Sequence, residues 1–224
     1  MPDRSETPKV SQPAVRRFSL YYRTLLEAQG AGAVSISSRE LAERTGVTGV
    51  QVRKDLSLIG SLGKRGLGYP IPALMRELGR ILGLDRRWPV VLVGVGSLGT
   101  ALLNNVRFRR KGFPIVAAFD IDAVKIGVPV GGTPIYHLDL LPHVVRQQEA
   151  WIGIITCSAD AAQLVCDRMV EAGLQAILTY APVTLEVPPG VSVRQVDTLV
   201  ELETLSFVLR PGRELSEDVD RPVG

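Results

Sequence analysis

Apolar residues in the N-terminal part of the chain fall into short segments with helical spacing, separated by glycines and polar residues. The first segment begins after Pro13 and stops near Gly30, and its three- and four-residue intervals predict a helix. Its apolar positions are Val15, Phe18, Tyr22, Leu25 and Leu26. A later segment predicts a second amphipathic helix, with Leu74, Leu78, Ile81 and Leu82 on one face.

Between these segments, two capping boxes mark the starts of two short helices. Ser37-Ser38-Arg39-Glu40 starts a helix that buries Leu41 and Ala42, and Thr48-Gly49-Val50-Gln51 starts one that runs to about Ile59. Gly46 supplies the turn between them. Two short helices joined by a tight turn form a helix-turn-helix.

The second of these helices has the polarity that DNA reading requires. Val52, Leu56 and Ile59 are expected to face the core, which leaves Gln51, Arg53, Lys54 and Ser57 pointing outward. Arginine suits guanine edges, glutamine suits adenine, and lysine or serine suits phosphates and bases. The segment from Gly60 to Tyr69 holds four glycines around Lys64 and Arg65, which predicts a hairpin wing that carries two cations to the DNA.

The resulting prediction is a winged helix-turn-helix that binds double-stranded DNA. The same pattern also fits a three-helix domain with a basic, solvated face, but the positions of the cations and capping boxes favour DNA contact. The expected DNA-contact residues are Ser38, Thr48, Gln51, Arg53, Lys54, Ser57, Lys64 and Arg65.

Beyond residue 88 the pattern changes to short β-branched runs. Pro89 to Gly94 is typical of a buried parallel strand, and it leads into Gly94-Val95-Gly96-Ser97-Leu98-Gly99 and a helix from Thr100 to about Val106. In this fingerprint the first glycine permits the turn, the second lets a pyrophosphate approach, and the third allows close helix–strand packing. The N-terminus of the helix favours phosphate.

A second strand, from Pro114 to Phe119, ends in Asp120, 21 residues after Gly99. An acid there would accept hydrogen bonds from the adenosine ribose and would repel a 2′-phosphate, so the pattern predicts NAD(H) rather than NADP(H). Asp122 and Lys125 are expected to be solvated loop residues. Strands at Thr133–Tyr136, Trp151–Thr156 and Gln175–Tyr180 and a helix at Ala159–Ala172 complete a wound sheet. A Rossmann-like domain with another nucleotide, or with none, remains the alternative.

Composition and charge add a contrast between the two halves of the chain. The 224 residues carry a net charge of +3, which divides into +7 up to Arg87 and −4 from Trp88 onward. A basic half joined to an acidic half is typical of a nucleic-acid-binding module attached to a second domain. Trp88 to Val106 has no charged residue for 19 positions, but glycines and asparagines interrupt it, so no membrane segment is predicted.

The remaining candidate chemistry is sparse. Cys157 and Cys166 are the only cysteines, which excludes a disulfide scaffold and favours a reducing, cytoplasmic setting. Both are expected to pack as small apolar residues, although Cys157 follows a strand end, where a redox thiol is conceivable. His137 and His143 lack partners at metal-ligand spacing, so we predict surface positions and no metal site. No catalytic residue is predicted.

Taken together, these residues resemble the Rex family of redox-sensing transcriptional repressors. The resemblance spans about Pro13 to Leu209, and its most specific part is Gln51-Val-Arg-Lys-Asp-Leu-Ser57 with Gly63-Lys-Arg-Gly-Leu-Gly-Tyr69. Further matches are Ile36-Ser-Ser-Arg-Glu-Leu-Ala-Glu43, Gly46-Val-Thr48, Gly94 to Gly99, Phe119-Asp-Ile-Asp122 and Ala181-Pro-Val-Thr-Leu-Glu-Val-Pro188.

The resemblance implies an α/β protein in which an N-terminal winged helix-turn-helix precedes a Rossmann-like NAD(H)-binding domain and a swapped C-terminal helix. It implies a homodimer that binds a palindromic operator and leaves it when NADH rises. The expected cofactor residues are Gly94 to Gly99, Asp120, Thr156 and Thr198. The expected divisions are a disordered 1–12, a DNA-binding 13–85, a Rossmann domain 86–196, a dimerisation helix 197–210 and a disordered 211–224.

The chain departs from its relatives at the positions that the resemblance assigns to the switch. In some relatives an arginine of the first helix exchanges partners with an aspartate and a tyrosine. Arg23 and Asp197 match the first two, whereas Asn105 stands at the tyrosine position and Thr198 at the position beside the nicotinamide. The hypothesis is that NADH binding is retained and that discrimination between NADH and NAD⁺ is weaker than in relatives.

Two other functions remain to be separated from this one. An NAD-dependent dehydrogenase would need a substrate domain and an acid or base near the nicotinamide, for which the sequence after the Rossmann half offers no histidine or lysine. A winged-helix regulator could instead respond to CoA, although Asp120 disfavours the 3′-phosphate of that ligand.

Overall fold

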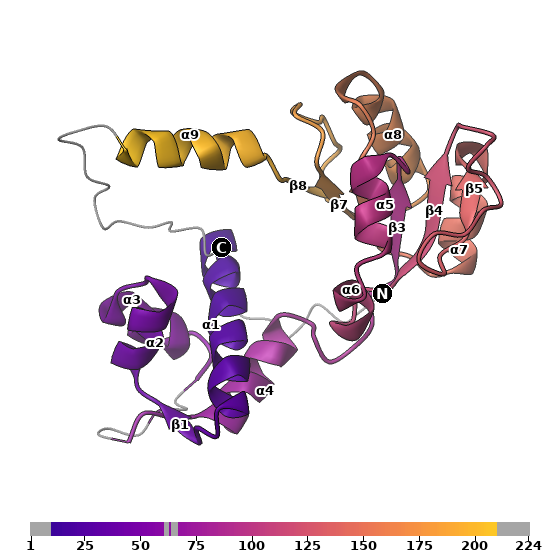
Figure 1. Ribbon diagram of the computed structural model, residues 1–224. Helices are drawn as coiled ribbons and strands as arrows, with labels where there is room; N and C mark the ends of the chain where they lie inside the picture. The colour runs from indigo at the N-terminus through magenta and orange to yellow at the C-terminus, as the bar shows by residue number, and fades with distance from the viewer. Residues whose placement is uncertain (1–9, 61–62, 64–66, 210–224) are drawn as a thin grey trace. The chain divides into compact units, whose positions relative to one another are not determined.

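The computed structural model describes residues 10–60, 63 and 67–209 (Figure 1). They form two compact units that meet along the chain at Asp85 and Arg86. The N-terminal unit is helical with one small sheet, and the second unit is built on a parallel sheet.

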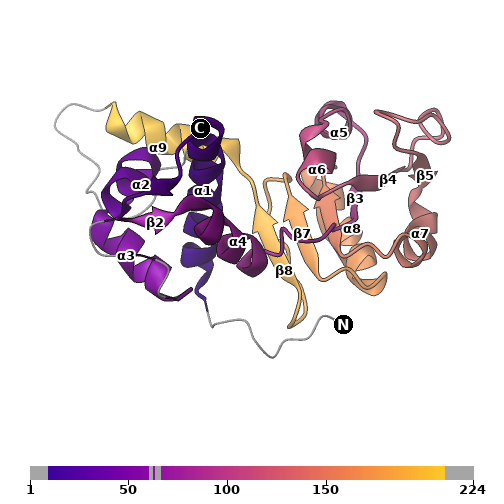
Figure 2. The same cartoon turned by 90° about the horizontal axis from the view of Figure 1, so that it is seen from below.

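The N-terminal unit contains four helices and one pair of short strands. The helices are α1 (Gln12–Gly30), α2 (Ser38–Thr45), α3 (Gly49–Ser57) and α4 (Ile71–Ile81). The strands β1 (Ser35–Ile36) and β2 (Tyr69–Pro70) pair antiparallel. Helix α1 packs against α2 and α4, and α2 packs against α3 (Figure 2). The predicted helices are therefore present, and α3 ends two residues before the expected Ile59.

The core of this unit differs from the prediction at some positions of α1. The structure buries Ala14, Phe18, Tyr21 and Leu25, whereas Val15 is 39% exposed. Tyr22, expected in the core, is only partly buried. Phe18 and Leu25 are buried as predicted, and Tyr21 takes the place expected of Tyr22, since its hydroxyl has a buried partner that the apolar pattern could not reveal. Each fully buried large side chain contributes about 1.5–3 kcal/mol of transfer free energy.

The second unit is a six-stranded parallel sheet in the order β5-β4-β3-β6-β7-β8. Its strands are β3 (Val90–Val93), β4 (Ile115–Asp120), β5 (Ile135–His137), β6 (Ile152–Ile155), β7 (Ala176–Thr179) and β8 (Ser192–Gln195). Its helices are α5 (Ser97–Leu103), α6 (Arg107–Arg110), α7 (Leu141–Gln147), α8 (Ala159–Glu171) and α9 (Thr198–Val208), with a 3₁₀ turn at Leu138–Leu140. Strands β4 and β6 lie on opposite sides of β3, so the order reverses there.

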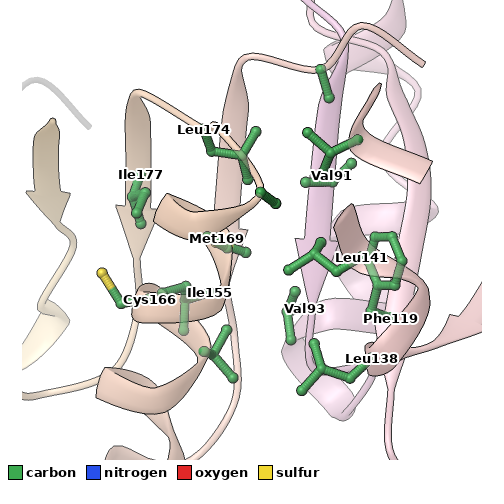
Figure 3. Packing of buried hydrophobic residues seen from close by; sticks show 14 of the residues in the cluster. Val91, Val93, Phe119, Leu138, Leu141, Ile155, Cys166, Met169, Leu174 and Ile177 are labelled. Carbon is green, nitrogen blue, oxygen red and sulfur yellow. The ribbon is translucent and has the colours of Figure 1, made fainter. Parts of the chain in front are cut away.

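Alternate residues of the central strands pack on opposite faces of this sheet. Val91 and Val93 of β3 join Leu141 of α7 and Met169 of α8 in the larger core, part of which Figure 3 shows. Val90 and Leu92 face the other side, where Leu103 of α5 joins them. The buried β-branched run at β3 is therefore the two-sided strand that the sequence predicts.

The predicted helices and strands of the second unit are close to those observed there, which include three additional α-helices or strands. Helix α5 begins at Ser97 and ends at Leu103, earlier than expected, and β5 begins at Ile135 rather than Thr133. The elements α6, α7 and β8 have no counterpart in the prediction. The predicted apolar C-terminal helix is present as α9, and its large apolar side chains are exposed: Leu199, Val200, Leu202, Leu205 and Phe207.

Candidate functional site

Local hydrogen bonds set the two helices of the predicted helix-turn-helix. The side chain of Ser37 accepts from the amide of Glu40 at 3.0 Å, and that of Thr48 accepts from the amide of Gln51 at 3.2 Å. Gly46 ends α2 in the left-handed region, at φ 68°. Each cap contributes about 1 kcal/mol to the stability of its helix. Because each cap joins groups only three residues apart, neighbouring residues determine where these helices start and end.

The polar side chains of α3 separate into an exposed group and a clamped one. Arg53, Lys54 and Ser57 are exposed, as predicted. Arg53 approaches the half-buried Ser38 of α2, with 3.4 Å between Nη1 and Oγ, and the hydroxyl of Ser57 donates to the carbonyl of Lys54 at 2.7 Å. The side chain of Thr48 is used as the cap of α3.

Gln51 departs from the prediction because it does not simply point outward. Its amide is half-buried and donates to Asp55 Oδ1 at 2.7 Å. Asp55, which the sequence analysis did not single out, is only 1% exposed. A glutamine already hydrogen-bonded within its own helix is less available to adenine than the prediction assumes.

Asp55 of α3 accepts four short hydrogen bonds, three of which come from α1. Arg17 donates twice, from Nε to Oδ2 at 2.6 Å and from Nη2 to Oδ1 at 2.8 Å. The hydroxyl of Tyr21 donates to Oδ2 at 2.9 Å, and Gln51 supplies the fourth contact. An acid three residues after the buried Val52 and next to Leu56 was the available signal, because that position faces the core of an amphipathic helix.

The electrostatics of this cluster favour the charged form of Asp55. Burial acts to raise its pKa, but the hydrogen bonds from Arg17, Tyr21 and Gln51 outweigh that effect and lower the pKa below its usual value. The hydrogen bond to Asp55 raises the pKa of Arg17. Burial and the same carboxylate raise the pKa of Tyr21 well above its usual value, so the phenol remains a donor.

Acid should therefore weaken the N-terminal unit through Asp55. A group whose pKa is lowered by folding stabilises the native state above its unfolded pKa, here about 3.9, and loses that contribution as the pH falls through the folded pKa. We expect the free energy of unfolding of the wild-type chain to fall more steeply than that of Asp55→Asn as the pH drops below about 5 and through the lowered pKa of Asp55. Urea titrations followed by far-ultraviolet circular dichroism at several pH values measure both profiles, and parallel profiles would contradict the assignment.

The predicted wing is described only at its base. Lys64 and Arg65 lie outside the described residues. At the base, Gly68 has φ +75°, and a Cβ there would come within 2.9 Å of the carbonyl carbon of Ile36. The segment therefore returns to β2 through a position that requires glycine.

In the second unit, the glycine fingerprint lies where the strand order reverses. Gly94 has φ +101°, and a Cβ there would lie 2.7 Å from the amide nitrogen of Cys157. A Cβ on Gly99 would collide with the carbonyl oxygen of Gly94. By contrast, a Cβ on Gly96 would meet nothing within 4 Å, so this backbone is open. Gly94 and Gly99 thus shape the turn, and Gly96 leaves the space that a pyrophosphate needs.

Asp120 supports this turn from the neighbouring strand. Its Oδ2 accepts from the amide of Val95 at 2.8 Å and from Lys125 Nζ at 3.1 Å, and its Oδ1 accepts from the amides of Ile121 and Asp122 at 2.8 and 3.0 Å. Burial acts to raise its pKa, but these hydrogen bonds lower it. A carboxylate offers about four acceptor positions, so the predicted ribose contact of Asp120 competes with four internal donors.

The surroundings of Asp120 correct one expectation and limit another. Lys125 is not merely solvated, because it pairs with both Asp120 and Asp122. Val95, predicted as a cofactor residue, buries its side chain at 4% exposure, which leaves only its backbone for the turn. Ser97 and Leu98 are exposed. Thr156 donates to the carbonyl of Gly94 at 2.6 Å, so its hydroxyl holds β6 to the turn.

The cysteines and histidines offer little further chemistry. Cys166 is fully buried in the core shown in Figure 3. Cys157 is half-buried, and burial raises the pKa of its thiol, with Asp120 acting in the same direction, so the reactive thiolate is disfavoured. His137 and His143 are partly or fully exposed. Within the described ranges no group of three or more potential metal ligands occurs, and no helix is long and apolar enough to cross a membrane.

The predicted switch residues belong to different units. Arg23 is an exposed residue of α1 in the N-terminal unit. In the second unit, Asn105 Oδ1 accepts from the amide of Arg107 at 3.1 Å, and Asp197 caps α9 by accepting from the amide of Leu199 at 2.9 Å. Thr198, the first residue of α9, is exposed. The exchange of partners between Arg23 and Asp197 therefore stays a prediction.

Family models match both units separately. Residues 9–57 match the model described as "Putative DNA-binding protein N-terminus", and residues 85–183 match the model described as "CoA binding domain". Together with the parallel six-stranded sheet, these matches confirm the predicted combination of a DNA-binding helical domain and a Rossmann-like domain.

Relatives and solved structures match most of the chain. The redox-sensing transcriptional repressor Rex of Streptomyces coelicolor (strain ATCC BAA-471 / A3(2) / M145) is 42% identical over 215 residues, 95% of this chain and 83% of that protein. Rex of Pelotomaculum thermopropionicum is 46% identical over 201 residues, 90% and 94% of the two chains. A crystal structure of RSP with β-NAD⁺ and operator DNA has a TM-score of 0.84 and 35% identity, covering 89% and 92%. RSP with β-NADH has a TM-score of 0.82 and 34% identity, covering 90% and 94%.

Proposed function

Because the chain belongs to the Rex family of redox-sensing transcriptional repressors, we propose that it represses transcription by binding a palindromic operator and releases it when NADH binds. The family consists of transcriptional repressors rather than enzymes, as predicted. The observation that carries the proposal is the pairing, in one chain, of exposed cations on a clamped α3 with a glycine turn that is open at Gly96. RSP supports it, since that repressor binds NAD⁺ with operator DNA and also binds NADH.

NAD(H) would be held by the turn from Gly94 to Gly99. Gly96 leaves room for the pyrophosphate, and Thr156 and Asp120 hold the turn in place. The cofactor supplies the signal through its nicotinamide, which differs between the two forms by a hydride and one positive charge. NADH must bind the conformation of low DNA affinity more tightly than it binds the conformation of high DNA affinity. A ligand with equal affinity for both conformations would not change their populations. Each tenfold loss of DNA affinity requires that the binding free energy of NADH differ by about 1.4 kcal/mol between the two conformations.

A homodimer would supply the two half-sites and use α9. The exposed apolar residues of α9 include Leu199, Leu202 and Leu205, at 62%, 59% and 59% exposure. A helix that exposes several large apolar side chains is stabilised when another protein surface covers those side chains. We propose that the segment 197–210 crosses to a second copy of the chain, as the family resemblance implies. Sedimentation of Leu202→Lys/Leu205→Lys beside the wild type tests this, and an unchanged dimer would contradict it.

The proposal as a whole is tested by fluorescence anisotropy of a labelled palindromic duplex of the family's type at fixed salt. The chain is titrated first, and NADH or NAD⁺ is then added. Release by NADH at concentrations where NAD⁺ releases less is the expected result. Tight DNA binding that ignores both nucleotides would retain the repressor and reject NADH as its signal, and no DNA binding would reject the whole proposal.

Arg53→Ala should weaken operator binding and relax base preference at one position of each half-site. Removing a hydrogen bond to a base edge costs about 1–3 kcal/mol of discrimination. Anisotropy with the operator and with single-base variants measures the change. Arg39→Ala is the matched control, since Arg39 is exposed on α2 and was not predicted to contact DNA. Equal operator affinities of Arg53→Ala and the wild type would contradict the assignment of α3.

Thr198→Phe should increase the preference for NADH over NAD⁺. A threonine stacks on a neutral ring less well than an aromatic side chain, and an offset aromatic pair is worth about 0.5–1.5 kcal/mol. We expect the ratio of the two affinities to rise by several fold, measured by titrating each nucleotide into wild type and variant. Thr204→Phe, a change on the same helix away from its first turn, serves as the control. An unchanged ratio in Thr198→Phe would reject the hypothesis.

CoA remains a second candidate ligand because the model matched by residues 85–183 is described as a CoA binding domain. The two carboxylates at Asp120 and Asp122 disfavour an added phosphate at the adenosine ribose, although Lys125 partly offsets them. Competition of CoA against bound NADH separates the two. Displacement at equal or lower concentrations of CoA would favour CoA as the signal.

A further inference from the structure

A second basic block lies in the otherwise acidic half of the chain. Residues 86–119 contain six arginines and lysines and no acid. Residues 120–209 contain eleven acids against four arginines and lysines. The negative charge of the second unit is therefore confined to the part after Phe119, and the net charge of this half hides a concentrated positive segment. The six cations are Arg86, Arg87, Arg107, Arg109, Arg110 and Lys111, which we name the amino-edge patch.

The fold brings the two ends of this block together at one edge of the sheet. The amide of Trp88 donates to the carbonyl of Gly112 at 2.7 Å, and a Cβ on Gly112 would lie 3.1 Å from the carbonyl oxygen of Arg86. The segment at Arg86 thus runs beside the end of α6. The segment at Arg86 precedes β3, and α6 precedes β4. The patch therefore lies at the amino ends of these parallel strands (Figure 1). The glycine turn and Asp120 lie at the opposite, carboxyl ends.

Among the residues that the structure describes, no carboxylate pairs with these charges. All six side chains are exposed, and none takes part in an ion pair within the ranges that the structure describes. Arg86 lies over the ring of Trp88, 4.1 Å from its centroid, which orients the guanidinium without neutralising it. Arg107 stands three and four residues before Arg110 and Lys111, a spacing at which like charges on a helix repel. Repulsion between these cations lowers the stability of the free chain, and a bound polyanion would reduce that repulsion.

We propose that the amino-edge patch binds the phosphate backbone of duplex DNA outside the base pairs that α3 reads. This inference rests on the proposed function, since it requires a chain already held on an operator. Five of the six residues are arginines, whose planar guanidinium suits phosphate. The patch also begins at Arg86, directly after the N-terminal unit ends at Asp85, so operator binding raises its local DNA concentration.

The test compares two duplexes that share one operator. One ends at the operator, and the other extends it by about ten base pairs, one helical turn, on each side. The wild-type chain should bind the long duplex more tightly than the short one. Arg109→Gln/Arg110→Gln should lose about tenfold in affinity on the long duplex and less than about twofold on the short one. For a dimer, the salt slope on the long duplex should fall by about two to four units, near 0.9 for each phosphate that the variant no longer neutralises.

The matched control is Arg146→Gln/Arg194→Gln, which removes two exposed arginines of the same unit that are not part of the patch. NADH affinity, measured on all three proteins, confirms that the dinucleotide domain is intact. The inference is overturned if the patch variant keeps the wild-type affinity and slope on the long duplex, or if the control loses as much. Equal binding of both duplexes by the wild type would also overturn the inference and would leave the proposed function intact. A chain that binds neither duplex would contradict the proposed function.

Discussion

Replacing Asp55 by alanine is expected to lower the free energy of unfolding of the N-terminal unit by about 3 kcal/mol and to abolish measurable operator binding at micromolar protein. The variant leaves the largely buried Arg17 unpaired and removes the acceptor for Tyr21 and Gln51. Breaking a buried pair from one side is costly because the remaining charge stays desolvated. Helix α3 then loses its polar anchor on α1, so its cations are no longer held in one orientation.

Urea titration followed by far-ultraviolet circular dichroism measures the stability of the N-terminal unit. Tryptophan fluorescence would report on the other unit, because both tryptophans lie there. Asp55→Asn should fall between wild type and Asp55→Ala, since an amide oxygen still accepts from Tyr21. Glu43→Ala is the control, because its pair with Arg39 is exposed and should contribute within about 0.5 kcal/mol. If Asp55→Ala is as stable as this control and still binds the operator, the clamp does not position α3.

Replacing Gly96 by alanine is expected to reduce NADH affinity at least tenfold, about 1.4 kcal/mol, while leaving the fold at least as stable as before. The backbone there, at φ −84°, is accessible to alanine, and a Cβ meets nothing within 4 Å. A methyl group in that opening blocks the approach of the pyrophosphate. Removing a glycine at a compatible position also restricts the unfolded chain, which adds up to about 1 kcal/mol of stability.

Gly94→Ala provides the contrast within the same turn. Its φ of +101° and the 2.7 Å approach to the amide of Cys157 make alanine strained there, so stability should fall by more than about 1 kcal/mol. Isothermal titration with NADH and thermal unfolding separate the two outcomes. NADH binding by Gly96→Ala at wild-type affinity would show that the pyrophosphate does not pass this position.

Features that depend on neighbouring residues were predictable from the chain. Ser37 and Thr48 cap α2 and α3 as expected, because a cap joins groups only three residues apart. The tight packing at Gly94 and Gly99 and the open space at Gly96 followed from a spacing that the strand–turn–helix unit imposes. The buried run of β3 revealed a two-sided strand for the same reason.

Features that depend on distant residues were not predictable. The apolar pattern placed Tyr22 in the core, whereas the structure buries Tyr21 to reach Asp55, 34 residues away. The hydrogen bond from the amide of Val95 to Asp120, 25 residues later, was not expected, and the ribose contact of Asp120 stays a prediction. The charge totals of the two halves concealed the patch formed by Arg86 and α6.

The amino-acid sequence by itself determined the two-domain organisation, the helix-turn-helix, the dinucleotide turn and the family, since each is written in local spacing. Only the tertiary structure decided which polar groups are already engaged and which cations gather without a partner. The physical reason is that a carboxylate or guanidinium looks the same in the sequence whether it is solvated or paired. Its partner is chosen by the packing of elements far apart in the chain, as Arg17 and Asp55 demonstrate.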